Sequence, residues 1–485
     1  MLNEFSIKDY EFKFADEKRS ELGEKLANLQ RTCIEKNIPV IIIVDGWESS
    51  GKGFVMNDLV RELDTKHTLV HTFDDFSRES DYSYTRQFWR AMPAKGSLAI
   101  FYRSMYFSMF NDLKIKKKAK NKRIEDLQNL EKMLSDDGTI ILKFFLHIDR
   151  KTLKNNVEVL KEDKYRKFFV DRYDEEQIKK YDEFKNNIDK ILENTNFEFS
   201  PWMVIPSVDI KDASKEVLGK SIELIDSKLG EIEKKRKSDK KYKFDGADGQ
   251  NILEKIDLSL TVSDEDYDKQ LDALQEEASN LAYELYVNKV PTVMVFEGID
   301  AAGKGGTIQR LLKEIDPRLY KINPTSAPNQ VESDHHYLWR FYNNLPKKGH
   351  MSIYDRSWYG RVMVERVEGF ANEFEWSRAY EEINNMEEGL VSDGVLLLKY
   401  LLVISKDEQE SRFKDRQENK PYKITDEDWR NREKWDDYIK SMDNMLEYTN
   451  TNYAPWVVLP SENKKYARLE VLKDFINRAQ KALKK

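Results

Sequence analysis

The sequence predicts an α/β protein with two tandem domains, each built on a parallel β-sheet that carries helices on both faces. Apolar strand segments alternate with long polar helical segments in both halves of the chain, and this alternation is typical of parallel sheets. Each half opens with a helical pattern of leucines, at Leu22 and Leu26 and again at Leu281 and Leu285. The expected strands are 40–44, 97–101 and 140–148, then 293–297, 351–354 and 395–404.

Several segments recur in the same order in the two halves, which indicates a duplicated domain. The glycine-rich segments 46–53 and 298–305 lie 252 residues apart (298 − 46). The segments 195–207 and 449–461 share the pattern T-N-x-x-x-x-P-W-x-V-x-P-S. Between the halves, the stretch 231–250 is rich in charge and poor in apolar residues, as in a solvated linker. We therefore expect an N-terminal domain over 1–235, a linker over 236–250 and a C-terminal domain over 251–485.

Composition and charge exclude several classes of protein. The chain has 485 residues, of which 35% are charged and 40% hydrophobic, as in a soluble globular protein. No apolar stretch approaches the roughly 20 residues of a membrane helix, and the N-terminal residues lack a signal-peptide pattern. We therefore expect a cytoplasmic protein with no membrane partner. The net charge of −7 disfavours broad nucleic-acid binding, and a single cysteine excludes an internal disulfide framework. Self-association is left open.

The glycine-rich segment of the C-terminal half has the spacing of a phosphate-binding loop, or Walker A motif. The strand segment 293–297 leads into the loop, whose Gly298, Gly303 and Lys304 have G-x-x-x-x-G-K spacing, and an amphipathic helical pattern follows. Backbone N–H groups of such a loop and of the helix start favour an anionic phosphate. The expected phosphate-binding residues are Gly298, Ala302, Gly303, Lys304, Gly305, Gly306 and Thr307.

Two carboxylates near this loop predict a metal site. Gly305 stands where a Ser or Thr normally holds Mg²⁺, but Asp300 lies inside the loop. Asp355 ends the strand segment 351–354, as the Walker B carboxylate of a phosphoryl-transfer site does. Together they predict an Mg²⁺ site, with Mn²⁺ as the other candidate ion, and the adjacent Arg356 is expected to bind phosphate. The alternative is that Asp355 only caps the turn after its strand.

A basic segment further along the chain predicts a lid. Arg412 and Arg416 are four residues apart, so they share one face of a helix that should break at Pro421. Lys420 and Lys423 flank this proline. The cations would close over bound phosphates. The alternative is an ordinary solvated helix face.

These motifs resemble the family-2 polyphosphate kinases. The resemblance is carried by GIDAAGKGGTIQ, by YDRSWYGRVMVERVEGF at 354–370 and by EQESRFKDR at 408–416. The segment YKITDEDW at 422–429 and the two-copy arrangement look most like the two-domain members that phosphorylate AMP. This resemblance implies two P-loop kinase domains similar to thymidylate kinase, each with a helical lid region. It also implies Mg²⁺-dependent transfer of a phosphoryl group from inorganic polyphosphate to a nucleoside monophosphate, with AMP as the expected acceptor.

The resemblance further implies roles for individual residues. Asp300 and Asp355 would be the Mg²⁺ carboxylates, Lys304 the loop lysine, and Arg356, Arg412 and Arg416 the phosphate contacts. Glu365 and Arg366 match the family motif without a separate role.

The N-terminal half departs from this pattern. It keeps the loop lysine as Lys52, but other residues stand opposite the metal carboxylates and the lid arginines, namely Glu48, Tyr102, Asn156 and Leu160. A tyrosine does not replace a carboxylate as an Mg²⁺ ligand at neutral pH. We therefore predict that this half does little or no catalysis. Its role would be structural, as a built-in partner that mimics a dimer, or that of a weak anion-binding surface.

Three other functions fit parts of the sequence. A polyphosphate-dependent kinase that converts ADP to ATP would share every motif. An ATP-dependent nucleoside monophosphate kinase would share the loop and fold but is disfavoured by Gly305. A phosphate-sensing scaffold would suit the N-terminal half.

Overall fold

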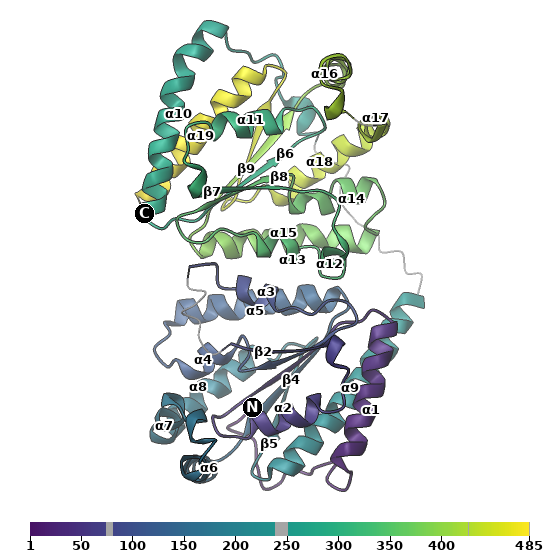
Figure 1. Cartoon of the computed structure of the whole chain (residues 1–485), viewed down its shortest axis with the longest axis vertical. Helices are drawn as coiled ribbons and strands as arrows, with labels where there is room; N and C mark the ends of the chain where they lie inside the picture. Colours follow the sequence, from purple (N-terminus) through teal and green to yellow (C-terminus); the bar gives the residue numbers. More distant parts are fainter. Residues whose placement is uncertain (74–80, 238–250, 425, 485) are drawn as a thin grey trace. The chain divides into compact units, whose positions relative to one another are not determined.

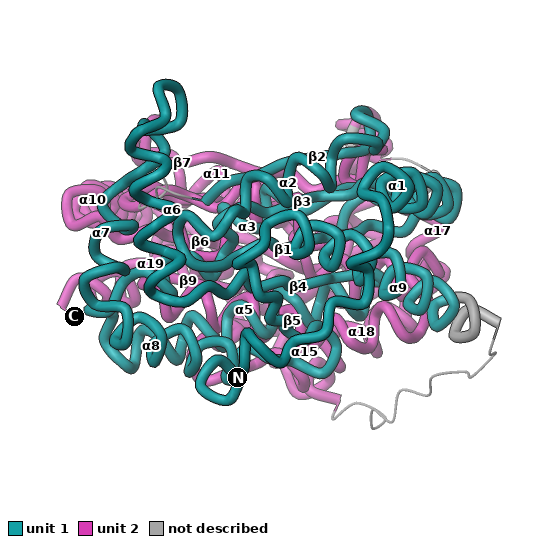
Figure 2. Tube along the Cα trace, turned by 90° about the horizontal axis from the view of Figure 1, so that it is seen from below, with its two compact units in different colours: residues 1–78, 87–240, 333–336 teal, residues 79–86, 241–332, 337–485 magenta. Residues whose placement is uncertain are grey.

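The computed structural model describes residues 1–73, 81–237, 251–424 and 426–484. They form two compact units, which Figure 2 colours separately. The first unit contains the described residues of 1–73, 87–237 and 333–336, and the second contains those of 81–86, 251–332 and 337–484. The expected linker 236–250 lies outside the described residues except for 236 and 237, so the domain boundaries stay predictions.

Each half of the chain contains one five-stranded parallel sheet, as the sequence predicts (Figure 1). The strand order is β2-β3-β1-β4-β5 in the N-terminal half and β7-β8-β6-β9-β10 in the C-terminal half, which is the same order in both. The strands of the N-terminal half are β1 (Val40–Gly46), β2 (Thr68–Thr72), β3 (Leu98–Tyr102), β4 (Ile140–His147) and β5 (Trp202–Pro206). Those of the C-terminal half are β6 (Thr292–Glu297), β7 (Tyr320–Pro324), β8 (Met351–Asp355), β9 (Leu396–Val403) and β10 (Trp456–Pro460).

Helices connect the strands and cover both faces of each sheet (Figure 1). The N-terminal half has α1 (Arg19–Glu35), α2 (Lys52–Val60), α3 (Arg86–Arg90), α4 (Phe107–Asn111), α5 (Lys117–Asp136), α6 (Arg150–Glu162), α7 (Arg172–Lys179), α8 (Tyr181–Asn194) and α9 (Ile210–Lys237). The C-terminal half has α10 (Asp264–Val287), α11 (Lys304–Leu311), α12 (Gln330–Ser333), α13 (Trp339–Asn343), α14 (Val364–Val367), α15 (Glu373–Ser392), α16 (Lys406–Asn419), α17 (Asp426–Glu433), α18 (Trp435–Thr449) and α19 (Lys464–Leu483).

The six strands predicted from apolar runs are confirmed, and four further strands are present. The central strands β1 and β6 are buried along almost their whole length, as continuous apolar runs require. The four additional strands, β2, β5, β7 and β10, form the sheet edges. The edge strand β2 leaves Leu69 39% and Val70 54% exposed, so its residues need not form an apolar run. Short edge strands therefore escape a search for such runs.

A buried ion pair occurs in both halves at equivalent places. Glu387 on α15 and Lys399 on β9 are 2.7 Å apart, and both side chains are fully buried. Glu131 on α5 and Lys143 on β4 are 2.9 Å apart and equally buried. Each pair lies 256 residues from its counterpart (387 − 131 and 399 − 143), so the duplication extends to the polar core.

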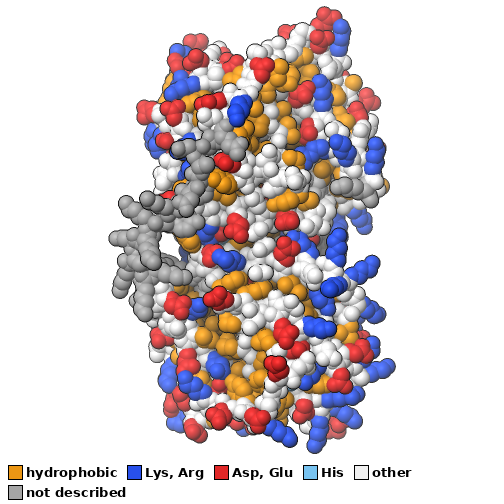
Figure 3. All heavy atoms as spheres, turned by 180° about the vertical axis from the view of Figure 1, so that it is seen from behind, with side chains coloured by type: hydrophobic (Ala, Val, Ile, Leu, Met, Phe, Trp, Pro, Cys, Tyr) orange, Lys and Arg blue, Asp and Glu red, His pale blue; other side chains and the backbone are white. Residues whose placement is uncertain are grey.

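The surface is mixed in charge. Figure 3 shows acidic and basic side chains interspersed over the face that it draws. Across the described ranges, no helix is both long enough and apolar enough to cross a bilayer.

Candidate active site

The phosphate-binding loop of the C-terminal half lies between β6 and α11, in the predicted strand-loop-helix context. Gly298 is required at its start, since a Cβ there would lie 2.4 Å from the carbonyl oxygen of Leu402. Gly303 caps α11 with a φ of 108°, a left-handed conformation that disfavours other residues. Ala301 adopts a φ of 63° in the same loop. The loop therefore has two left-handed residues, Ala301 and Gly303, directly before α11.

Lys304 begins α11 and is held by the loop. Its ammonium group donates to the carbonyl oxygens of Gly298 at 2.6 Å and Ile299 at 3.3 Å. Burial, with the nearby charge of Arg356, lowers the pKa of Lys304. The structure therefore brings the predicted lysine to the predicted loop.

The two predicted metal carboxylates belong to this site. Burial alone would raise the pKa of Asp300, but the charges of Arg356 and Lys304 hold it below its usual range. Arg356 forms an ion pair with Asp300. Asp355 ends β8, opposite Phe296 of β6 in the strand register. A Cβ on Gly305 would lie 3.7 Å from Asp355 Oδ2, so the position that usually carries a hydroxyl faces this carboxylate.

This donor set fits Mg²⁺. An Mg²⁺ ion in a phosphoryl-transfer site is usually bound by one or two carboxylates and takes its other ligands from phosphate and water. Asp300 and Asp355 supply two such groups beside a phosphate loop. Within the described part of the chain, no group of three or more His, Cys, Asp or Glu residues could hold a metal by itself. The metal prediction therefore depends on bound phosphate to complete the coordination.

Glu297 is a buried carboxylate that the motif search missed. It is the last residue of β6, and its Oε1 accepts from the N–H of Ser357 at 2.8 Å and from the hydroxyl of Ser357 at 2.7 Å. Burial raises the pKa of Glu297 to about 7. In the N-terminal half, Asp45 accepts from Ser104 in the same way, and burial raises its pKa to about 6. A comparison of the two halves would have identified this residue, because both keep a carboxylate immediately before the loop.

Replacing Glu297 with Gln should change the pH dependence of stability. A carboxyl group with a pKa near 7 in the folded protein and near 4.5 when unfolded stabilises the fold fully below pH 4.5 and loses that contribution as the pH rises through 7. Glutamine cannot ionise, yet it can still accept from Ser357. We expect Glu297→Gln to be more stable than the parent at pH 8.5, by up to about 3 kcal/mol, with a smaller difference at pH 5. Urea unfolding of both proteins at the two pH values measures this, and parallel pH profiles would contradict it.

Arg412 lies beneath the phosphate loop. Its guanidinium donates to the carbonyl oxygens of Ala301 at 2.8 Å and Ser461 at 2.6 Å, and to Glu408 at 2.6 Å. The side chain is buried. These contacts hold the left-handed Ala301 in place, while the predicted phosphate contact of Arg412 stays a prediction.

The N-terminal half supports the loop in the same way. There Asn156 donates from Nδ2 to the carbonyl oxygen of Ser49 at 2.9 Å, and Ser49 has a φ of 49°. The alignment of Asn156 with Arg412 therefore agrees with the geometry.

The predicted lid region consists of α16, the 3₁₀ turn Pro421–Lys423 and α17. Helix α16 ends at Asn419, next to the predicted break. Helix α17 reaches the loop through Asn431, whose Nδ2 donates to Asp300 Oδ2 at 3.2 Å. A second contact joins α17 to α16, where Arg432 pairs with Glu410 at 2.6 Å. Asn431 was not predicted from the sequence, because a single amide side chain in a charged helix belongs to no recognised motif.

For the other predicted residues, the structure gives exposure or protein contacts. Arg416 lies half-buried one turn after Arg412, and Lys420 is exposed. Lys423 lies in the 3₁₀ turn, and its side chain lies outside the described part. Glu365 pairs with Arg361 at 3.0 Å, and Arg366 donates to Asn444 at 2.9 Å. The roles of these residues in binding stay predictions.

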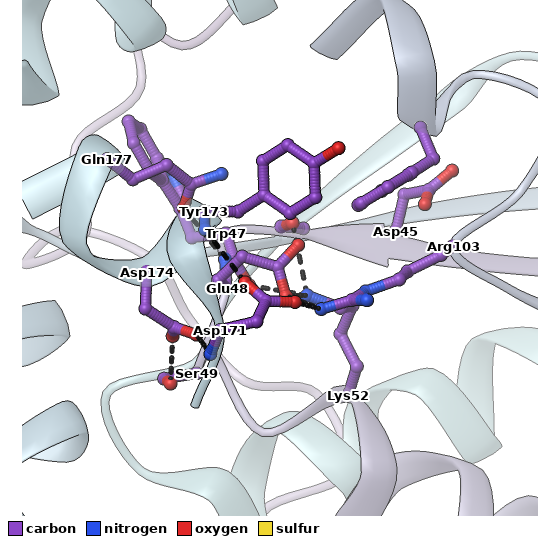
Figure 4. A network of polar contacts seen from close by, with 12 residues as sticks. Asp45, Trp47, Glu48, Ser49, Lys52, Arg103, Asp171, Tyr173, Asp174 and Gln177 are labelled. Atoms are coloured by element: carbon purple, nitrogen blue, oxygen red, sulfur yellow. Dashed lines mark hydrogen bonds and ion pairs between the residues drawn. The ribbon is translucent and has the colours of Figure 1, made fainter. Parts of the chain in front are cut away.

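The equivalent loop of the N-terminal half has a different environment (Figure 4). The register places Tyr102 opposite Val44, as it places Asp355 opposite Phe296, so Tyr102 occupies the position of the second carboxylate. Arg103 lies between two carboxylates, at 2.7 Å from both Glu48 and Asp171.

Helix α7 contacts this N-terminal loop. Asp171 and Asp174 form the capping box of α7, and Asp174 accepts from the hydroxyl of Ser49. Gln177 accepts from the N–H of Glu48 at 2.9 Å (Figure 4). Three carboxylates, Glu48, Asp171 and Asp174, therefore lie around the loop, and Arg103 pairs with the first two.

Comparisons with known proteins agree with this architecture. The family model described as polyphosphate kinase 2 matches residues 10–237 and 261–485. The chain is 37% identical over 450 residues to the polyphosphate:AMP phosphotransferase of Pseudomonas syringae pv. tomato, covering 91% of this chain and 90% of that protein. It is 35% identical over 476 residues to the protein of the same name from Pseudomonas aeruginosa, covering 96% of this chain and 95% of that protein.

A solved structure shows the same fold. The crystal structure of a protein described as polyphosphate kinase 2 from P. aeruginosa PA01 matches with a TM-score of 0.83 and 34% identity, covering 96% of this chain and 95% of that one. The prediction of two tandem P-loop kinase domains is thereby confirmed. With matches in both halves of its sequence, the chain belongs to the polyphosphate kinase 2 family.

Proposed function

We propose that this protein transfers a phosphoryl group from inorganic polyphosphate to AMP, forming ADP, and that the C-terminal half performs the transfer. The main support for the proposal is that Asp300, Lys304 and Asp355 lie together at one phosphate loop. The relatives that match about nine-tenths of the chain are polyphosphate:AMP phosphotransferases, which supports AMP as the acceptor. The N-terminal half, over 1–235, is proposed as a non-catalytic partner of the domain over 251–485.

The reaction needs positioning and charge stabilisation more than it needs a base. The attacking oxygen belongs to the phosphate of AMP and is already ionised, so no proton has to be removed from it. Lys304 and the loop N–H groups bind the terminal phosphates of the donor. Asp300 and Asp355 would hold Mg²⁺, which when bound supplies positive charge to the transferred phosphoryl group. Lid cations such as Arg416 neutralise charge in the transition state.

A direct assay separates this function from its alternatives. The full chain is incubated with AMP, Mg²⁺ and polyphosphate in the absence of ATP, and the products are resolved by anion-exchange chromatography. We expect ADP to appear in proportion to the enzyme. Formation of ATP from ADP, but not of ADP from AMP, would favour the diphosphate kinase. Activity only with ATP as donor would favour the nucleoside monophosphate kinase, and no transfer with any donor would favour a scaffold.

Removing Arg412 should lower turnover more than it weakens binding. Arg412→Ala removes the donors that hold Ala301 and Ser461, together with a positive charge beside the loop. We expect kcat to fall by about 10²-fold, with a much smaller change in KM for either substrate. Lys414→Ala on the same helix is the matched control, because Lys414 is exposed and pairs only with Glu410 among the contacts described. A raised KM with unchanged kcat would contradict the prediction.

A further inference from the structure

A basic segment at the start of α5, in the N-terminal half, belongs to none of the motifs above. Residues 113–124 contain no acidic side chain and seven cations, namely Lys114, Lys116, Lys117, Lys118, Lys120, Lys122 and Arg123. The chain as a whole has a net charge of −7, so this positive charge is a local concentration on an acidic protein. A block of like charge in such a background is typical of a surface that attracts anions.

The basic segment lies at the carboxyl edge of the N-terminal sheet. Strand β3 ends at this edge with Tyr102, α4 follows, and α5 then returns toward the start of β4. Because β1 is parallel to both β3 and β4, the glycine-rich loop after β1 lies at the same edge. Ligands of parallel α/β sheets bind at this edge.

Four exposed lysines of the basic segment have no protein partner for their charge. Within the described ranges, none of their ammonium groups makes a hydrogen bond or an ion pair, and they are Lys114, Lys116, Lys117 and Lys118. The nearest carboxylate before them in the sequence, that of Asp112, accepts from the backbone N–H of Lys114 at 2.9 Å. We call these four residues the lysine run. Its charge is available to an external anion.

Helix stability does not account for the lysine run, because the first turn of a helix favours negative charge. Lys116 is the N-cap residue of α5 but makes no side-chain capping hydrogen bond, and the first turn contains no acidic residue. The equivalent helix α15 of the C-terminal half begins 256 residues later (373 − 117). There Asn372 and Glu375 form a capping box, and Glu373 adds a second carboxylate. The lysine run is therefore a feature of the N-terminal half alone.

We propose that the lysine run is a second binding site for inorganic polyphosphate, which holds long donor chains on the N-terminal half. Lysine binds phosphate as a point charge, so four lysines within five residues suit a flexible chain of phosphates without a fixed shape. The proposal rests on the proposed function for the identity of the donor. It gives the half that lacks the second metal carboxylate a role in binding the substrate.

The basic segment lacks the side chains that would favour other polyanions. Proteins bind single-stranded nucleic acid with aromatic side chains that stack on its bases, and residues 112–124 contain no aromatic residue. Proteins bind membrane surfaces by inserting apolar side chains beside cations, whereas Leu113 and Ile115 are partly buried in the protein. Polyphosphate has neither bases nor acyl chains, so positive charge is sufficient to bind it.

A second binding site should act only on long donors. A chain held at the lysine run stays close to the protein, which raises its effective concentration and lowers its KM. The turnover number should not depend on the lysine run, because none of its residues belongs to the proposed catalytic groups. Tripolyphosphate has too few phosphates to occupy two sites at once, so its KM should not depend on the lysine run either.

The test compares variants of the full chain in which four lysines are replaced together. In the first variant, every residue of the lysine run becomes Gln. The control carries the same change of charge at four exposed lysines that pair with carboxylates at 2.8–3.8 Å, namely Lys18, Lys25, Lys154 and Lys161. We expect the first variant to raise KM for long-chain polyphosphate by about 10-fold, with kcat and the KM values for AMP and tripolyphosphate changed by less than about 2-fold. The control, and a variant with Arg throughout the lysine run, should keep the parent values.

Binding without turnover keeps this test independent of the proposed function. Calorimetry with long-chain polyphosphate, in the absence of AMP and Mg²⁺, should show the loss of affinity in the Gln variant of the lysine run and in neither other variant. The affinity of that Gln variant should also depend less steeply on salt, because fewer counterions are released on binding. A parent protein that transfers nothing from polyphosphate would overturn the proposed function, while these affinities would still decide the second site.

Two other results would overturn the second site itself. One is an unchanged affinity for long-chain polyphosphate after the lysine run is replaced with Gln. The other is an equal loss of affinity in the control, which would mean that only the total charge matters. RNA or anionic vesicles that displace long-chain polyphosphate from the parent at a lower concentration of phosphate groups would overturn the assignment of the ligand.

Discussion

Lys304→Ala is expected to lower kcat for polyphosphate-dependent phosphorylation of AMP by about 10²–10³-fold, whereas Lys52→Ala should change it by less than about 2-fold. Both lysines begin a helix after a glycine loop and donate to loop carbonyl oxygens, Lys304 to Gly298 and Lys52 to Trp47, each at 2.6 Å. The two substitutions are therefore closely matched in local structure. The expected difference arises from the partners of the lysines. Steady-state kinetics of the two purified variants with AMP and polyphosphate measure it.

The partners of the two lysines differ in the groups that bind metal and phosphate. Lys304 lies near Asp300 and Asp355, which would hold Mg²⁺ against the donor. Lys52 lies 3.6 Å from Glu48, whose carboxylate is shared with Arg103 at 2.7 Å. The pair of Glu48 with Arg103 has a counterpart in Asp300 with Arg356, so the difference lies at Tyr102, which stands where Asp355 supplies the second carboxylate.

Control measurements keep this comparison interpretable. Lys52 is buried, so Lys52→Met, which keeps most of the aliphatic chain, accompanies Lys52→Ala. Urea unfolding verifies that each variant is folded before its activity is compared. A folded Lys52 variant without activity would overturn the division of labour between the halves, and so would a Lys304 variant that retains full turnover.

The sequence predicts the parts of the site that follow from local patterns. The glycine loop, Lys304 and Asp355 each stand next to a strand or helix whose apolar run is readable, so their positions at the carboxyl edge of the sheet follow from the topology. The alignment of Tyr102 with Asp355 is likewise readable, and the strand register agrees with it.

Other parts of the site depend on tertiary contacts that leave no local pattern. Asn431 reaches Asp300 from 131 residues away, and Ser461 donates to the carbonyl oxygen of Ala302 from 159 residues away. The spacing of Arg412 and Arg416 indicates a shared helix face but not that Arg412 turns under the loop. Comparing the two halves recovers part of this information, because Ser207 donates to the carbonyl oxygen of Ser50 at the place of Ser461.

Lys399→Met is expected to destabilise the protein by about 3–5 kcal/mol, because it leaves a buried carboxylate without its cation. The ammonium group of Lys399 donates to Glu387 at 2.7 Å and to the carbonyl oxygen of Thr449 at 2.8 Å. Glu387 also accepts from Trp358 at 3.0 Å and from Tyr359 at 2.6 Å, so it is held in place when the lysine is removed. Chemical denaturation followed by tryptophan fluorescence measures the loss.

A second substitution distinguishes the uncompensated charge from a simple packing defect. In Lys399→Met/Glu387→Gln the amide can still accept from Trp358 and Tyr359, but no charge remains buried. We expect the double variant to recover at least about half of the stability lost in Lys399→Met, because removing both charges of a buried pair costs much less than removing one. Equal stability of the single and double variants would show that the lysine acts through its packing.

The counterpart Lys143→Met, whose Glu131 keeps hydrogen bonds from Tyr106 and Ser200, should show the same pattern in the N-terminal half. That result would indicate that the duplicated pair supports the fold in both halves.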